Sequence, residues 1–121
     1  MNNIKLLNSI SIGTDPGGNP ITINAYEYSN GVSGPTLYLQ GGVHGGEVTL
    51  WVLKQLVTKL QNYKIKGNIV IIPIANPVAW GQRTYFSTNG KFDFYMGKDW
   101  NRSYPGNMDG TLSQRISSVG F

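Results

Sequence analysis

The sequence contains no cysteine, which excludes disulfide bonds, thiolate zinc ligands and a cysteine nucleophile. Charged residues are also scarce, at 13% of the 121 residues, and the ten basic ones form no long run. The net charge of +4 is therefore a weak argument for a nucleic-acid module, and we expect no nucleic-acid partner. No apolar run approaches a membrane span and no signal-peptide core follows Lys5, so we expect no membrane partner and a cytoplasmic location.

The remaining composition is typical of a soluble globular domain. Hydrophobic residues make up 40% of the chain and aromatic residues 12%. The 16 glycines cluster between apolar segments without a repeat, which favours ordered loops over low-complexity sequence. A chain of this length can bury one core, so we expect a single domain over residues 1–121.

The first part of the chain predicts a β-hairpin. Residues 21–26 alternate between apolar and polar side chains and residues 4–12 do so in part, which predicts a strand in each segment. The segment TDPGGN at residues 14–19 separates them and is rich in turn formers. A third, short apolar strand is expected at residues 36–40.

The spacing of apolar residues then changes to that of a helix over residues 47–62, followed by a buried strand at residues 68–74. Strand, helix and strand in this order predict a right-handed βαβ unit with a parallel pair. Trp51 is expected in the core. The apolar face of the helix comprises Leu50, Leu53, Leu56, Val57 and Leu60.

The last part of the chain is less regular. Residues 75–109 are polar and glycine-rich and predict a long loop, which in a compact domain is usually functional. A helix capped by Asp109 or Thr111 is expected at residues 111–118. Together these elements predict an incomplete α/β sheet with an unpaired apolar strand edge where a further strand would dock.

One histidine and one glutamate stand where ligands bind in α/β sheets. His44 and Glu47 lie in the segment QGGVHGGE, residues 40–47, between a strand and a helix. Imidazole and carboxylate groups are good zinc ligands. Alternatively, Glu47 only stabilises the helix N-terminus, or the glycines cradle a phosphate, although the segment lacks the Lys-Ser/Thr ending of a P-loop.

Two further motifs follow in order. Asn76-Pro77 ends the buried strand, Arg83 comes seven residues after Asn76, and DWNRSYPG occupies residues 99–106. In this order and at these distances, the three motifs resemble those of the aspartoacylase/succinylglutamate desuccinylase family, within the zinc carboxypeptidase-like superfamily. The resemblance covers Leu37 to Gly106 and implies the N-terminal part of a mixed-sheet zinc carboxypeptidase-like fold.

The resemblance also implies roles for five side chains. His44 and Glu47 match the first two zinc ligands of the family. Arg83 matches the arginine that polarises the scissile carbonyl and stabilises the oxyanion. Asn101 and Arg102 match the pair that grips the substrate carboxylate, a role that suits a bidentate guanidinium and an amide donor.

Other parts of the family's site have no match. The family takes its third zinc ligand, a histidine, from a later strand and its general base, a glutamate, from further on, but His44 is the only histidine here. Asp93, Asp99 and Asp109 have oxygen atoms but match no ligand motif, and Asp99 is expected to orient a ligand or the Asn101-Arg102 segment. We therefore expect a C-terminally truncated catalytic domain.

The resemblance implies a zinc-dependent hydrolase of amide or ester bonds, either a deacylase of a carboxylate-bearing N-acyl amino acid or a carboxypeptidase-like enzyme. The 121-residue chain alone is expected to be inactive, because part of the site is absent. The alternative is a non-enzymatic remnant that binds a carboxylate ligand or a complementing chain.

Overall fold

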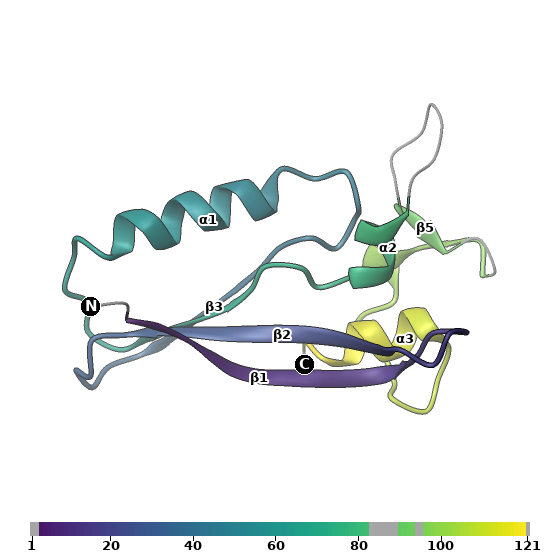
Figure 1. Ribbon diagram of the computed structural model, residues 1–121, viewed down its shortest axis with the longest axis horizontal. Coiled ribbons are helices and arrows are strands. Elements are labelled where there is room, and N and C mark those ends of the chain that lie inside the picture. The colour runs from purple at the N-terminus through teal and green to yellow at the C-terminus, as the bar shows by residue number, and fades with distance from the viewer. Residues whose placement is uncertain (1–2, 83–89, 94–95, 121) are drawn as a thin grey trace.

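A four-stranded mixed sheet forms the centre of the protein, seen here in a computed structural model that describes residues 3–82, 90–93 and 96–120 (Figure 1). The strands are β1 (Ile4–Thr14), β2 (Pro20–Ser29), β3 (Thr36–Gln40) and β4 (Asn68–Ile72). Their spatial order is β1-β2-β4-β3. The β1–β2 and β2–β4 pairs are antiparallel, and the β3–β4 pair is parallel.

The β1–β2 hairpin confirms the predicted hairpin and is longer than predicted. Its turn is fixed by the Asp15 carboxylate, which accepts hydrogen bonds from the Asn19 backbone at 2.9 Å and from its side-chain amide. Aspartate side chains that accept hydrogen bonds from nearby amides commonly stabilise turns. The hydrogen bonds from Asn19 also lower the Asp15 pKa.

The βαβ unit is also confirmed. The helix α1 (Thr49–Leu60) connects β3 to β4, and these two strands pair in parallel. The helix begins two residues later than predicted, since Val48 occupies the N-cap position without a side-chain cap. Glu47 therefore lies in the turn before the helix and not in its first turn.

Helix α1 covers one face of the sheet (Figure 1). Its apolar side packs on Tyr28, Ile69 and Ile71 and comprises Leu53, Leu56, Val57 and Leu60. The prediction that Trp51 lies in this core is wrong, because its side chain is 65% exposed. Trp51 is two positions from Leu53, and two residues correspond to about 200° around a helix, so it faces solvent.

The prediction of a loop throughout residues 75–109 is wrong for the described residues, which contain several short elements. They are α2 (Pro77–Gly81), β5 (Phe92–Asp93), β6 (Lys98–Asp99) and the 3₁₀ helix η1 (Trp100–Arg102). These elements are too short to give a periodic sequence signal, and side-chain caps on α2 and η1 help define them.

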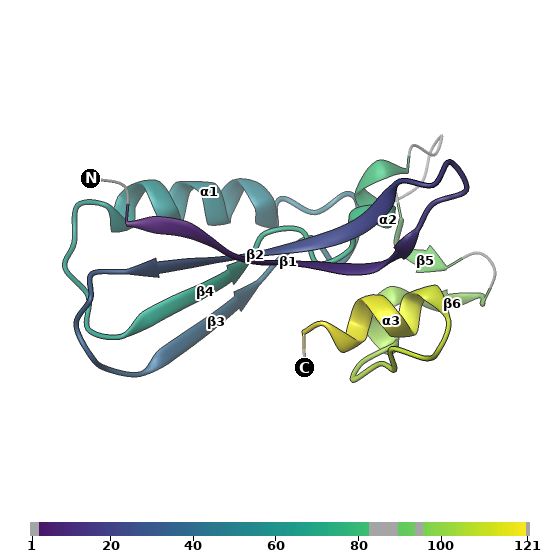
Figure 2. The ribbon, with the colours of Figure 1, turned by 60° about the horizontal axis from the view of Figure 1, so that its bottom comes forward.

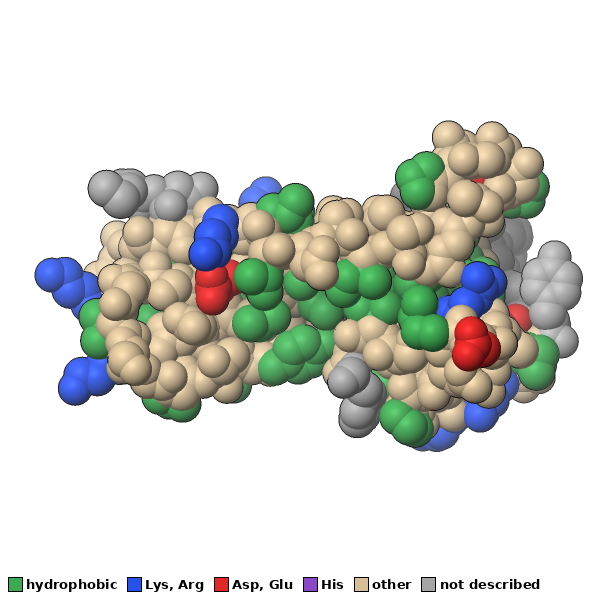
Figure 3. Space-filling view, turned by 90° about the horizontal axis from the view of Figure 1, so that it is seen from below, with side chains coloured by type: hydrophobic (Ala, Val, Ile, Leu, Met, Phe, Trp, Pro, Cys, Tyr) green, Lys and Arg blue, Asp and Glu red, His purple; other side chains and the backbone are tan. Residues whose placement is uncertain are grey.

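The last helix, α3 (Leu112–Ser118), lies against the opposite face of the sheet from α1 (Figures 1 and 2). Thr111, one of the two predicted N-cap residues, caps this helix and forms a capping box with Gln114. The second core lies between α3 and the sheet and includes Ile12, Ile23, Ile72, Trp100 and Ile116. Figure 3 shows a band of hydrophobic side chains along this side of the molecule.

The outer strand β3 has one neighbour, β4, among the described residues. Leu37 is 53% exposed and Tyr38 43% exposed along it. The predicted unpaired apolar strand edge is therefore present. Within the described ranges, no helix combines the length and apolar character needed to cross a membrane.

Candidate functional site

The loop that carries His44, here called the His44 loop (residues 41–48), is hydrogen-bonded to the end of β4 and to the start of α1. The Gly41 amide donates to Ile72 at the end of β4, and the Gly42 amide donates to the Thr49 hydroxyl at 2.9 Å. Gly42 has a φ of +64°, and a Cβ atom there would lie 2.6 Å from Trp80 Nε1. Only glycine combines this backbone conformation with so close an approach.

The imidazole of His44 lies between two carboxylates. Its Nδ1 atom is 2.8 Å from Glu47 Oε1, and its Nε2 atom is 2.8 Å from Asp99 Oδ1. The His44 side chain is 13% exposed, that of Asp99 18% and that of Glu47 36%. The contact between His44 Nδ1 and Glu47 is therefore closer to solvent than the contact between His44 Nε2 and Asp99.

This arrangement fits two ligands of a metal ion. A neutral imidazole has one N–H group, so when Nε2 donates to Asp99, the Nδ1 lone pair faces the Glu47 carboxylate. Two acceptors so close repel unless a proton or a cation lies between them. His44 Nδ1 and Glu47 are thus a suitable donor pair for zinc, with Asp99 fixing the tautomer.

The donor set is incomplete in the described part of the chain. No three histidine or acidic side chains there are grouped so as to hold a metal ion. Asp99 does not act as a third donor, because it contacts the opposite ring nitrogen from Glu47. A complete catalytic zinc site of this type needs another protein ligand.

Asp99 joins His44 to the predicted substrate-binding residues. The Asp99 carboxylate caps η1 by accepting the Asn101 amide at 2.9 Å, while it also contacts His44. Burial raises the Asp99 pKa, but the hydrogen bonds from His44 and the Asn101 amide outweigh this effect and leave the pKa below its usual value. Asp99 therefore stays ionised and holds the two segments together.

Asn101 and Arg102 are both exposed on η1. The Arg102 guanidinium donates to the Asn101 carbonyl through Nη1 at 3.3 Å. The contact between His44 and Asp99 places this short helix beside the His44 loop, so the predicted carboxylate-binding pair and the predicted metal ligands share one region. Arg83, the fifth predicted residue, lies outside the described residues.

Asn76 has a positioning role that the motif alone did not reveal. Its side chain is 1% exposed; the amide donates to the Val43 carbonyl at 3.2 Å and the oxygen accepts the Ala79 amide at 3.0 Å. Asn76 thus caps α2 and holds the residue next to His44. Asparagine before proline is an N-cap signal, so the cap was predictable, but the contact with Val43 was not.

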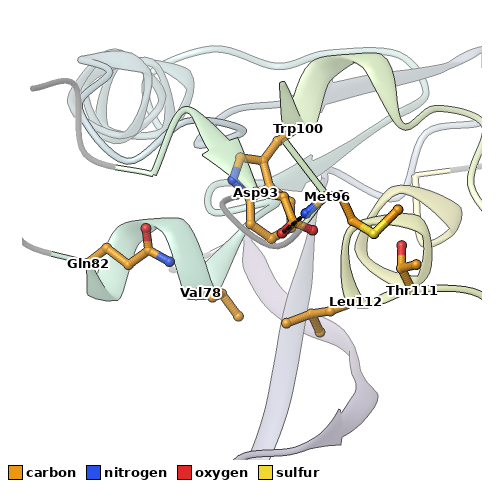
Figure 4. Close-up of a pocket in the computed structure, with 7 residues that line it drawn as sticks. All are labelled: Val78, Gln82, Asp93, Met96, Trp100, Thr111 and Leu112. Atoms are coloured by element: carbon orange, nitrogen blue, oxygen red, sulfur yellow. Dashed lines mark hydrogen bonds between the residues drawn. The ribbon is translucent and has the colours of Figure 1, made fainter. Parts of the chain in front are cut away.

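A separate cavity of about 410 Å³ lies between α2, the β5–β6 hairpin and the start of α3 (Figure 4). Its walls are mainly apolar and include Val78, Met96 and Leu112. Asp93 faces it, and its carboxylate accepts the Met96 amide at 3.2 Å (Figure 4). His44, Glu47, Asn101 and Arg102 are not among the residues that line this cavity, and Asp93 is not grouped with His44 and Glu47.

Comparison with known proteins agrees with the motifs. The succinylglutamate desuccinylase/aspartoacylase catalytic domain matches residues 33–119. An N-alpha-acetyl-L-2,4-diaminobutyric acid deacetylase from Halomonas elongata is 33% identical over 87 residues, which are 69% of this chain and 23% of that protein.

Two solved structures show the same fold. One, from Shewanella frigidimarina and assigned to the succinylglutamate desuccinylase/aspartoacylase group, has a TM-score of 0.85 and 25% identity, covering 99% of this chain and 43% of that one. The other is a metallo-carboxypeptidase from Pseudomonas aeruginosa with a TM-score of 0.65 and 20% identity, covering 98% of this chain and 31% of that one. This chain spans less than half of each of the three relatives.

The mixed sheet, with His44 between β3 and α1, is the α/β fold of these desuccinylase/aspartoacylase and metallo-carboxypeptidase structures. The match over residues 33–119 identifies the particular group. The chain belongs to the succinylglutamate desuccinylase/aspartoacylase family, which includes hydrolases.

Proposed function

We propose that this chain carries the N-terminal part of the active site of a zinc-dependent hydrolase that cleaves the amide bond of a carboxylate-bearing N-acyl amino acid. The observation that carries the proposal is the position of His44, with Glu47 on one ring nitrogen and Asp99 on the other. The deacetylase from Halomonas elongata supports the reaction class, because its substrate is an N-acetylated amino acid.

His44 and Glu47 would hold the zinc ion. Zinc, when bound, supplies a water of lowered pKa and a Lewis acid that polarises the scissile carbonyl. With zinc on Nδ1, the His44 proton would lie on Nε2, where the Asp99 carboxylate 2.8 Å away would accept it and hold the Nδ1 lone pair towards the metal. Because Asp99 also binds the Asn101 amide, the position of the imidazole and that of η1 are set together.

The substrate carboxylate would bind Arg102 and Asn101. A guanidinium offers a bidentate fork to a carboxylate, and both residues are exposed. An anion held there restrains the neighbouring acyl group and lowers the entropic cost of attack. Arg83 would donate to the oxyanion as it develops, an effect commonly worth about 3–4 kcal/mol per donor.

The third ligand and the general base would come from residues beyond this chain, in keeping with a truncated catalytic domain. For this reason the whole reaction belongs to the longer protein. The 121-residue chain would supply two ligands, the Asp99 carboxylate that contacts His44 Nε2, and the anion-binding pair. We expect it to bind zinc weakly and to hydrolyse little.

Calorimetric titration of zinc into metal-free protein tests the assignment. We expect weak binding with one zinc per chain, lost in the His44→Ala and Glu47→Ala variants and retained in the Asp109→Asn variant, whose side chain is exposed in a turn. Equal zinc binding by the wild type and the His44→Ala variant would contradict the proposal.

A second candidate is a carboxylate-binding remnant without catalytic activity. The incomplete donor set in the described residues favours it over a self-sufficient enzyme. It predicts that succinate binds in an Arg102-dependent manner whether or not zinc is present. Succinate binding that strictly requires zinc would instead favour the hydrolase site.

A further inference from the structure

The short helix η1 is held in place at its start. Asp99 caps it and contacts His44, and Trp100 is buried in the core with 4% of its surface exposed. Arg102 is the last residue of η1 and is exposed. The contacts of Asp99 and Trp100 all precede Arg102, so its position also depends on the residues that follow it.

Those residues are tied to the end of β3 by a side-chain hydrogen bond. The Gln40 amide donates to the Tyr104 hydroxyl at 2.6 Å, across 64 positions of the chain. Ser103, which precedes Tyr104, is 7% exposed, and its backbone amide donates to the Trp100 carbonyl at 3.1 Å. The backbone on the carboxyl side of Arg102 is therefore restrained as long as Tyr104 stays on Gln40.

The Gln40 side chain is itself held in one orientation. Its amide oxygen accepts a hydrogen bond from the Tyr38 hydroxyl at 2.5 Å, while its amide nitrogen donates to Tyr104. Burial raises the pKa of both tyrosine hydroxyls, so each stays protonated and able to form hydrogen bonds near neutral pH. Gly120 packs against this group, since a Cβ atom there would lie 2.7 Å from Gln40 Oε1.

The backbone of Gln40 belongs to the same framework as the proposed metal ligands. Gln40 is the last residue of β3 and pairs with Ile72 of β4. The next residue, Gly41, begins the His44 loop; it donates to the Ile72 carbonyl at 2.9 Å and accepts from the Ala75 amide at 2.8 Å. Figure 2 shows β3 running towards the part of the molecule that contains β6 and α3. The Gln40 side chain thus restrains the distance from the end of η1 to the start of the His44 loop.

We propose that Gln40 and Tyr104 are positioning residues for the substrate carboxylate, and that their hydrogen bond sets the distance between Arg102 and the metal site at His44. This inference rests on the proposed function and deepens it. Asp99 orients the imidazole, whereas Gln40 and Tyr104 restrain the guanidinium end of η1. With this distance set, the site favours substrates whose carboxylate stands a fixed number of bonds from the scissile carbonyl, because other lengths cannot reach both groups well.

Titration of succinate into the 121-residue protein with excess zinc, followed by NMR, tests this role. Tyr104→Phe removes only the hydroxyl and should weaken succinate binding by about three- to tenfold, as for one lost hydrogen bond. Zinc affinity should not change, because the contacts of His44 remain. Gln40→Leu should weaken succinate binding to a similar extent. The double variant should bind no more weakly than either single variant, since both changes remove the same hydrogen bond.

Tyr28→Phe is the matched control. It also removes a buried hydroxyl, one that donates to the Leu60 carbonyl at 2.5 Å, but it does so under α1. This variant should have a lower melting temperature and unchanged succinate binding. An equal loss of succinate binding in Tyr28→Phe and Tyr104→Phe would show that the effect is one of stability and would overturn the inference.

The remaining outcomes separate this inference from the proposed function. If Arg102→Ala loses succinate binding but Tyr104→Phe keeps it, the carboxylate site stands and the positioning role of Tyr104 is wrong. A parallel fall of zinc and succinate affinity in Tyr104→Phe would also overturn that role, because the whole site would then be disturbed. If Arg102→Ala binds succinate as tightly as the wild type, or the wild type binds none, the proposed carboxylate site is wrong and the inference fails with it.

Discussion

His44 and Asp99 are 55 positions apart in the chain, and their side chains meet at 2.8 Å between Nε2 and Oδ1. This contact joins the loop after β3 to the short helix that bears Asn101 and Arg102. It therefore couples the proposed metal ligands to the proposed substrate-binding residues. Several expectations follow from this coupling and from the packing that supports it.

Replacing Asp99 by asparagine should weaken zinc binding without unfolding the protein. The amide keeps the shape of the side chain but loses the charge that fixes the His44 tautomer, an effect of about 10- to 100-fold on metal affinity. Calorimetry of the Asp99→Asn variant measures it. The Asp109→Asn variant should bind zinc like the wild type, and unchanged affinity in Asp99→Asn would remove Asp99 from this role.

Replacing Gly42 by alanine should destabilise the fold. The new methyl group would lie 2.6 Å from Trp80 Nε1 and 2.9 Å from Ile74 Cα, in a backbone conformation unfavourable for alanine. We expect a loss of about 2–4 kcal/mol in unfolding free energy, measured by urea denaturation. Gly31→Ala is the control: its φ is +76° but its surroundings are open, so its cost should be about 1 kcal/mol.

Replacing Asn76 by alanine should affect both stability and the His44 loop. The variant loses the cap on α2 and the hydrogen bond to Val43, for a cost of about 2 kcal/mol. Zinc affinity should fall as well, because Val43 adjoins His44. The Thr111→Ala variant loses a comparable cap on α3 and should be less stable without a change in zinc affinity. Equal zinc affinities in all three proteins would show that Asn76 is only a cap.

Two arginine variants separate substrate binding from turnover in a longer protein that contains this chain. Arg102→Ala should chiefly raise KM, because it removes the proposed carboxylate partner. Arg83→Ala should chiefly lower kcat, by about 100-fold or more, because it removes a donor to the oxyanion. Steady-state kinetics on an N-acetylated amino acid measure both constants. If Arg102→Ala chiefly lowers kcat and Arg83→Ala chiefly raises KM, the two proposed roles are exchanged.

The sequence by itself predicted the hairpin, the βαβ unit and the family, and it narrowed the cap of the last helix to Asp109 or Thr111, because each depends on a local pattern or on motif order. Regular periodicity identified β2 and α1, a continuous apolar run identified β4, and turn residues located the connections. The same reasoning failed between residues 75 and 109, where the described elements are two to five residues long and too short to show a period. It also failed for Trp51, whose direction depends on which side of α1 meets the sheet.

Only the tertiary structure decided which side chains meet. Asp99 and His44 are brought together by the packing of η1 beside the His44 loop, and Asn76 reaches Val43 because the ends of β3 and β4 adjoin. These contacts join residues 33 and 55 positions apart, and no local sequence pattern encodes such distances. The free edge of β3 was expected from the sequence, and the structure shows which strand carries it, because β4 is the single neighbour of β3 among the described strands.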